Sequence, residues 1–136
     1  MQLTVAIYKL TQAFPREEQF GLTSQIRRSA VSIPSNIAEG QGRTTIGDFR
    51  QFLGIARGST CEVQTQLEIA RALNFGDAKL IDGAESLSNE VRKMLFGLLE
   101  SLKPEPHQKP GTKKLSLRTM NYELRTVNTH YELRHL

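Results

Sequence analysis

Apolar residues recur at intervals of three and four along residues 1–102, the spacing that places them on one side of an α-helix. Four segments carry this spacing: residues 3–14, residues from about Phe20 to Glu39, residues from Thr44 or Thr45 to 73, and residues 77–102. No stretch of residues 1–102 alternates with period two, so strands are not expected there. The pattern predicts an all-α fold, an antiparallel up-down-up-down four-helix bundle.

Each predicted helix is bounded by residues that start or end helices. Pro15 ends the first, and Pro104 follows the fourth. Gly40 and Gly42 are expected to end the second helix. Pro34 lies inside that segment, where it removes one backbone hydrogen bond and clashes with the carbonyl group four residues earlier. This predicts either a kinked helix or two helices that meet near residues 32–33.

The core is expected to form from one apolar stripe per helix. The second-helix stripe is Leu22, Ile26, Ala30, Ile33 and Ile37. The third-helix stripe is Phe49, Leu53, Ala56, Thr60, Val63, Leu67 and Ala70. The fourth-helix stripe is Leu80, Ala84, Leu87, Val91, Met94 and Leu98, with Leu95 beside it. Such alternating steps of four and three are typical of helices packed in antiparallel bundles.

Charge is distributed unevenly along the chain. The formal net charge is +4, yet residues 1–102 hold 11 basic and 11 acidic side chains, while residues 103–136 hold 7 and 3. We expect residues 1–102 to form the bundle, and residues 103–136 to be a Pro-rich linker and a basic tail that is disordered or loosely docked. Because the basic excess lies in the tail, the high isoelectric point does not by itself indicate nucleic-acid binding by the bundle.

Features that the sequence lacks indicate the cellular compartment of the protein. A single cysteine, Cys61, cannot form an internal disulfide, and it is expected to be a buried packing residue. The first residues do not resemble a signal peptide, and no run of about 18 apolar residues predicts a membrane span. A cytoplasmic protein without membrane contact is expected.

Two rows of small or polar residues indicate helices packed on more than one side. On the second helix, one narrow arc holds Gln25, Ser29, Ser32, Asn36 and Glu39. This row predicts either a polar seam against a neighbouring helix or a recognition surface. On the third helix, Gly54 and Gly58 lie opposite the core stripe, although each interior glycine costs about 1 kcal/mol relative to alanine. Close approach of a partner subunit would offset that cost; tolerated surface glycines are the alternative.

Arginines are the candidate contacts to phosphate, because the planar guanidinium group can donate two parallel hydrogen bonds. The candidates are Arg27, Arg28, Arg43, Arg50 and Arg57. Solvated or intrachain-paired charges are the alternative interpretation. A symmetric oligomer would repeat the arginines in each subunit and strengthen a basic surface.

No catalytic set is recognisable in the sequence. The three histidines lie in the tail, far from Cys61, and the glycine-rich turn at residues 40–45 lacks the ending of a phosphate loop. We expect no catalytic residue, no metal site and no cofactor. The sequence therefore predicts a non-catalytic homo-oligomer that binds RNA or DNA phosphates through arginines, with a protein–protein scaffold or accessory subunit as the alternative.

One long run gives a specific family resemblance. Residues 25–40 read QIRRSAVSIPSNIAEG, Gly42-Arg43 follows, and further matches lie at Phe49, Phe52-Leu53, Ile55-Ala56, Gly58-Ser59, Leu67 and Lys93-Met94-Leu95. These residues resemble the 23S rRNA intervening sequence proteins over about residues 4–102. The resemblance points to Gln25, Arg27, Arg28, Asn36, Glu39 and Arg43 as important positions.

The resemblance implies a four-helix bundle that assembles as a homopentamer around a central channel. It also implies a relation to accessory proteins of diversity-generating retroelements. The partners that this relation implies, besides further copies of the chain, are RNA, DNA, a reverse transcriptase or another protein. Family members usually have a longer first helix, and the repeated Tyr-Glu-Leu-Arg of the tail lies outside the family pattern.

Overall fold

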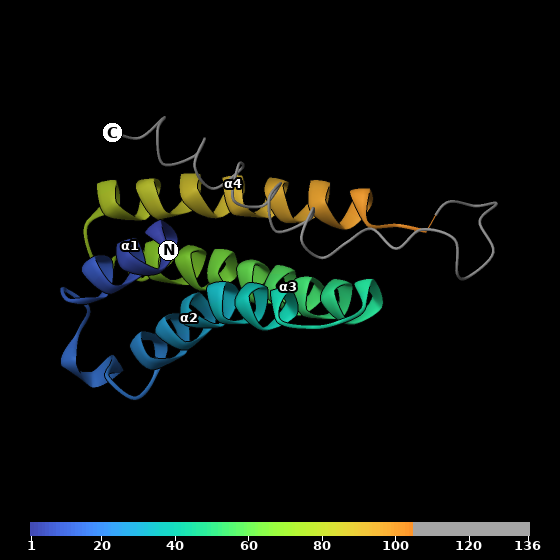
Figure 1. The fold of residues 1–136 in the computed structure, drawn as a ribbon. Coiled ribbons are helices and arrows are strands. Elements are labelled where there is room, and N and C mark those ends of the chain that lie inside the picture. Colours follow the sequence, from blue (N-terminus) through green and yellow to red (C-terminus); the bar gives the residue numbers. More distant parts are fainter. Residues whose placement is uncertain (105–136) are drawn as a thin grey trace. The chain divides into compact units, whose positions relative to one another are not determined.

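A computed structural model describes residues 1–104 of the chain, and the tail predictions lie outside these residues. Residues Met1–Leu102 form one unit, separate from Lys103–Leu136. In the described part, four α-helices follow one another (Figure 1), with one short 3-10 helix after the first. They are α1 (Gln2–Thr11), η1 (Arg16–Glu18), α2 (Leu22–Gln41), α3 (Ile46–Ala72) and α4 (Ala78–Ser101). The predicted all-α four-helix fold is confirmed.

Hydrogen bonds between helices give the directions of neighbouring helices. Thr4 of α1 donates to Ala30 of α2, while Arg27 of α2 donates back to Thr11 near the end of α1. The residue numbers of the contacting partners therefore increase along α1 while they decrease along α2, so the two helices are antiparallel. The same reversal relates α2 to α3 and α3 to α4, as expected for short connections.

The second helix is continuous through Pro34, so the alternative of two separate helices is wrong. Proline lacks the N–H that would bond to the carbonyl oxygen of Ala30, four residues earlier. The Thr4 hydroxyl of α1 donates to that oxygen instead, at 3.0 Å. A side chain from another helix thus satisfies the backbone group that the proline leaves without its helical partner.

Gly40 does not end α2, contrary to the sequence prediction. It lies inside the helix and is buried against α3, and the helix continues to Gln41 with Gly42 as its C-terminal cap. A Cβ atom added at Gly40 would lie 2.8 Å from Cδ2 of Phe49 and 2.9 Å from Cβ of Phe52. The glycine therefore permits the close approach of α2 to α3.

The first helix is short, and it ends at Thr11 rather than at Pro15. Phe14 follows the helix and is still buried, next to Phe75 of the connection between α3 and α4. The sequence also predicts a cap for each of the later helices, from the spacing of Thr45 and Asp48 and from Asp77 before the fourth apolar stripe. Both are confirmed: Thr45 accepts a hydrogen bond from the Asp48 N–H, and Asp77 accepts one from the Lys79 N–H.

The core-facing side of α4 differs from the predicted stripe. Buried positions on α4 are Ile81, Ala84, Ser88 and Leu95. Leu80 and Met94, two members of the predicted stripe, are exposed. Ala84 of that stripe and Leu95 beside it are buried as predicted, and Leu87, Val91 and Leu98 are half-buried, so the buried side is only turned from the predicted stripe toward Ile81 and Ser88. The helix turns this side toward α3, while the ten-residue α1 is too short to cover the neighbouring leucine-rich side along the whole of α4.

Candidate nucleic-acid interface

The polar row on α2 is mainly a seam against α3. The Ser29 hydroxyl donates to the Glu62 carboxylate at 2.8 Å, and the hydroxyls of Ser32 and Ser59 are 2.8 Å apart. Asn36 donates to the backbone oxygen and the hydroxyl of Ser32. The interpretation as a hydrogen-bonded seam between helices accounts for Ser29 and Ser32, whereas Asn36 bonds only to Ser32 of its own helix. Gln25 remains exposed, and its backbone oxygen accepts a hydrogen bond from Ser29.

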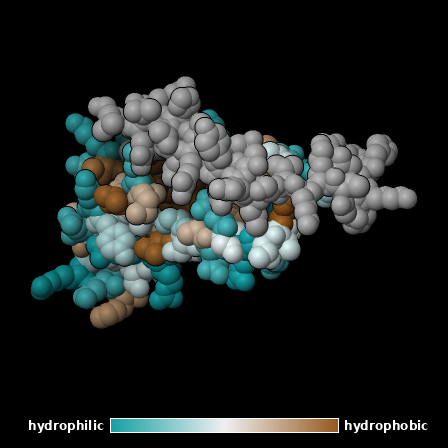
Figure 2. Space-filling model, in the orientation of Figure 1, coloured by the Kyte–Doolittle hydropathy of each residue, from teal (hydrophilic) through white to brown (hydrophobic). Residues whose placement is uncertain are grey.

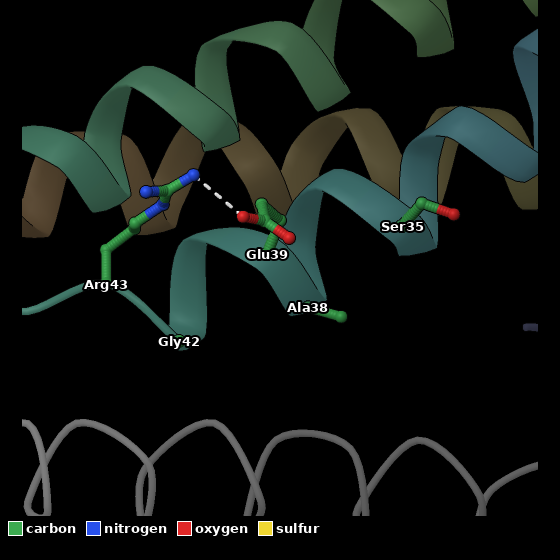
Figure 3. Close-up of a pocket in the computed structure, with 5 residues that line it drawn as sticks. All are labelled: Ser35, Ala38, Glu39, Gly42 and Arg43. Carbon is green, nitrogen blue, oxygen red and sulfur yellow. Dashed lines mark hydrogen bonds and ion pairs between the residues drawn. The ribbon is translucent and has the colours of Figure 1, made fainter.

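Glu39, at the end of the same row, belongs to a different cluster. It accepts a hydrogen bond from Arg43 at 2.7 Å, and the Arg43 guanidinium carbon lies 4.7 Å from the ring centre of Phe52. Figure 3 shows Glu39 and Arg43 at an open groove that is also lined by Ser35, Ala38 and Gly42. Arg43 therefore already has an acidic partner and an aromatic partner within the chain.

Arg27 is likewise engaged inside the bundle. Its Nε donates to the Thr11 hydroxyl at 2.7 Å, and its guanidinium carbon lies 4.7 Å from the ring centre of Tyr8. Both partners belong to α1. The arginine thus holds the short first helix to α2, where the sequence interpretation had placed a phosphate contact.

The remaining three candidates have no such partners. Within residues 1–104, Arg28, Arg50 and Arg57 take part in no hydrogen bond or ion pair, and Arg28 and Arg57 are exposed while Arg50 is half-buried. Arg28 lies on α2; Arg50 and Arg57 lie two turns apart on α3. The structure thus divides the five predicted arginines into two engaged side chains and three available ones.

A further arginine on α3 was not singled out from the sequence. Arg71 donates to Asp82 at 2.6 Å and to Glu85 at 2.9 Å, so it joins α3 to α4. These hydrogen bonds, that to Asp82 first, raise the pKa of the Arg71 guanidinium above its ordinary value. Since arginine is charged at any physiological pH, its positive charge is offset locally by the two carboxylates.

The outer side of α3 is open. A Cβ atom added at Gly54 or Gly58 would have no heavy atom of another side chain or helix within 4 Å, and Ile55 and Ile69 nearby are exposed. Cys61 is exposed as well, so the prediction that it packs in the core is wrong. It lies on this outer side because the core residues of α3 occupy the opposite side. Residues 1–104 therefore offer no packing partner for this face.

Neither metal-binding nor membrane-spanning features occur among the described residues. In residues 1–104 no group of three histidine, cysteine or acidic side chains is arranged to hold a metal ion. No helix in the same part of the chain is both long enough and apolar enough to cross a bilayer.

The described residues, with their arginine-bearing surface, define an all-helical bundle protein. Residues 1–97 match the family model of the 23S rRNA-intervening sequence proteins, and the chain belongs to this family. A crystal structure of a protein of unknown function from the S23 ribosomal protein family of Bacteroides thetaiotaomicron is similar, with a TM-score of 0.67 and 25% identity. The match covers 73% of this chain and 93% of that one. No curated protein shows significant similarity to the chain.

Proposed function

We propose that this chain is a non-catalytic, self-assembling bundle that binds RNA or DNA phosphates through Arg28, Arg50 and Arg57. The observation that carries the proposal is that these three arginines have no acidic partner in the described bundle, whereas Arg27 and Arg43 do have intrachain partners. An unpaired guanidinium group remains free to donate paired hydrogen bonds to a phosphate. The family name, which refers to ribosomal RNA, agrees with a nucleic-acid partner.

Self-assembly is supported by the open side of α3. Gly54 and Gly58 leave room for a second helix to approach, and Ile55 and Ile69 flank them with exposed apolar surface. Exposed apolar patches mark protein interfaces more often than isolated apolar residues do. A symmetric oligomer would place one set of arginines per subunit on a common surface, which would give a neutral bundle a locally basic face.

The phosphate contacts are tested by two variants on the same helix. Arg57→Ala and Arg71→Ala each remove one positive charge, but Arg71 is paired with Asp82 and Glu85. Binding of a labelled RNA is measured at several salt concentrations. We expect Arg57→Ala to weaken binding and to make the plot of log K against log salt shallower by at least about 0.7, the contribution of one phosphate contact.

Arg71→Ala is the control, and its binding and salt dependence should remain those of the wild type. Equal effects of the two variants would show that only the overall charge matters, and would contradict the proposed contacts. Absence of any salt-dependent RNA or DNA binding by the wild-type protein would contradict the function itself.

Assembly is tested by placing a long side chain on the open face. We expect the wild-type protein to have a solution mass several times the 15.3 kDa of one chain, and Gly58→Gln to lower that mass. Because Gly58 has open space around it in the single chain, the variant should fold normally. Light scattering gives the mass, and Gly83→Gln on α4 is the control. A monomeric wild-type protein at micromolar concentration would contradict assembly.

A scaffold that binds another protein is the second candidate. Figure 2 shows apolar side chains on the visible surface among hydrophilic ones. Exposed Leu80 and Met94 on α4, which α1 leaves uncovered, would suit an apolar partner. Copurification of a defined protein together with salt-independent, negligible RNA and DNA binding would favour this candidate over the first.

A further inference from the structure

The boundary between α3 and α4 changes its chemical character along its length. On α3, Arg50, Arg57, Gln64 and Arg71 recur every seven residues and therefore lie along one side of the helix. At one end of this row, Arg71 is paired with Asp82 and Glu85 of α4. In the middle, Gln64 donates to Asn89 and Ser88 at 3.0 and 3.3 Å. We call the boundary along this row the α3–α4 seam; Figure 1 shows the two helices that form it.

The register of these contacts locates the rest of the seam. Each step of seven residues moves two turns, or about 10.5 Å, along either helix. Since the helices are antiparallel, the step from Asp82 to Asn89 on α4 matches the step from Arg71 to Gln64 on α3. One further step places Arg57 level with Phe96. Arg50 lies two turns farther along, near the end of α4.

The seam has a near half, from Gln64 to Arg71 on α3, and a far half, from Arg50 to Arg57. The charge balance of the two halves differs. In the near half, Arg71 meets two carboxylates of α4. In the far half, by contrast, the α4 residues around the level of Arg57 are Arg92, Lys93 and Phe96. Glu100 is the acidic residue one turn beyond Phe96 on α4. Arg57, Arg92 and Lys93 are exposed, and the described residues give neither Arg57 nor Arg92 a hydrogen-bonding or ionic partner. This half of the seam is therefore locally basic, although the bundle as a whole is neutral.

Phe96 adds an aromatic ring to this basic surface. Its side chain is 56% exposed, and it lies one turn after Arg92 on the same side of α4. Aromatic rings flanked by arginines are typical of single-strand binding surfaces, because unpaired bases stack on the ring while cationic groups contact the backbone. A base inside a duplex does not present its face to such a ring.

We propose that the far half of the α3–α4 seam binds single-stranded nucleic acid, with a base stacked on Phe96 and phosphates held by Arg50, Arg57 and Arg92. The proposal rests on the proposed function and extends it by naming the form of nucleic acid and two further contacts, Phe96 and Arg92. The near half, from Gln64 to Arg71, where Arg71 is paired with Asp82 and Glu85, does not take part.

The test compares a 20-nucleotide oligo(dT) with a duplex of the same length, each carrying a fluorescent label, and uses the full chain. Phe96→Leu keeps the side chain apolar but removes the ring. We expect it to weaken oligo(dT) binding about 5- to 150-fold, the effect of losing one base–aromatic stack. Duplex binding and the salt slope should change little. Arg92→Gln should weaken oligo(dT) binding and reduce its salt slope by about 0.7.

Two matched controls accompany these variants. Phe20→Leu replaces a ring that is 90% exposed but lies before α2, away from the seam, and Arg71→Gln removes a paired arginine from the near half. Both should bind oligo(dT) as the wild type does. Circular dichroism and light scattering verify that every variant keeps its helix content and its mass.

The outcomes separate this proposal from the function on which it rests. If Arg57→Ala weakens binding while Phe96→Leu and Arg92→Gln do not, the protein binds phosphates but the seam proposal is wrong. The seam proposal is also overturned if the wild type binds oligo(dT) and the duplex with equal affinity and Phe96→Leu weakens the binding of both probes equally. If Phe96→Leu instead lowers the solution mass, Phe96 belongs to a subunit interface and not to a nucleic-acid site. Failure of the wild type to bind oligo(dT) overturns the seam proposal, and the proposed function falls as well only if the duplex and a labelled RNA also fail to bind.

Discussion

Replacing Phe49 with alanine is expected to lower the free energy of unfolding of the bundle by about 3–5 kcal/mol, the usual cost of removing a buried phenylalanine ring. Phe49 is 1% exposed and lies in the first turn of α3. Its ring contacts α2 at Gly40, where even an added Cβ atom would lie 2.8 Å away. With the ring gone, the two helices cannot close the cavity without shifting along much of their length.

Urea unfolding followed by circular dichroism measures this loss. The protomer concentration is held constant, because the stability of an oligomer depends on it. Phe20→Ala is the matched control: its ring is 90% exposed, so the change should be within about 0.5 kcal/mol. Equal midpoints for the two variants would mean that Phe49 does not fill the α2–α3 contact.

Gly76→Ala is expected to have the second large effect, a loss of about 2–5 kcal/mol from backbone strain and overpacking together. Gly76 has a φ of +77°, in the left-handed region that residues with a Cβ atom rarely adopt. In addition, an added Cβ atom would lie 2.8 Å from Cδ1 of Leu10 and 3.0 Å from Cε1 of Phe14. Both of these side chains are buried, so they have little room to move.

Gly83→Ala makes the same chemical change with the opposite expected sign. Gly83 lies inside α4 with open space around it, so alanine should stabilise the helix by about 1 kcal/mol. Thermal or urea unfolding of both variants tests the pair. A Gly76→Ala protein as stable as the wild type would contradict the described connection between α3 and α4.

The sequence identified part of the candidate site and missed another part. It named all five arginines, but the intrachain partners of Arg27 and Arg43 come from residues up to 19 positions away. Phe96 and Arg92 were missed, because an exposed ring beside an arginine is not visible in a helical stripe. The recurrence of Arg50, Arg57, Gln64 and Arg71 every seven residues was a signal for the α3–α4 seam.

The sequence by itself determined the number of helices, the caps at Thr45 and Asp77, and the family, because these depend on spacings and motifs within single segments. Only the tertiary structure decided that α2 continues through Pro34, that Gly40 is a packing contact, and that Cys61 is exposed. It also decided which side of α4 faces the core. Each of these depends on a partner segment distant in the chain, and burial and pairing are properties of two surfaces together.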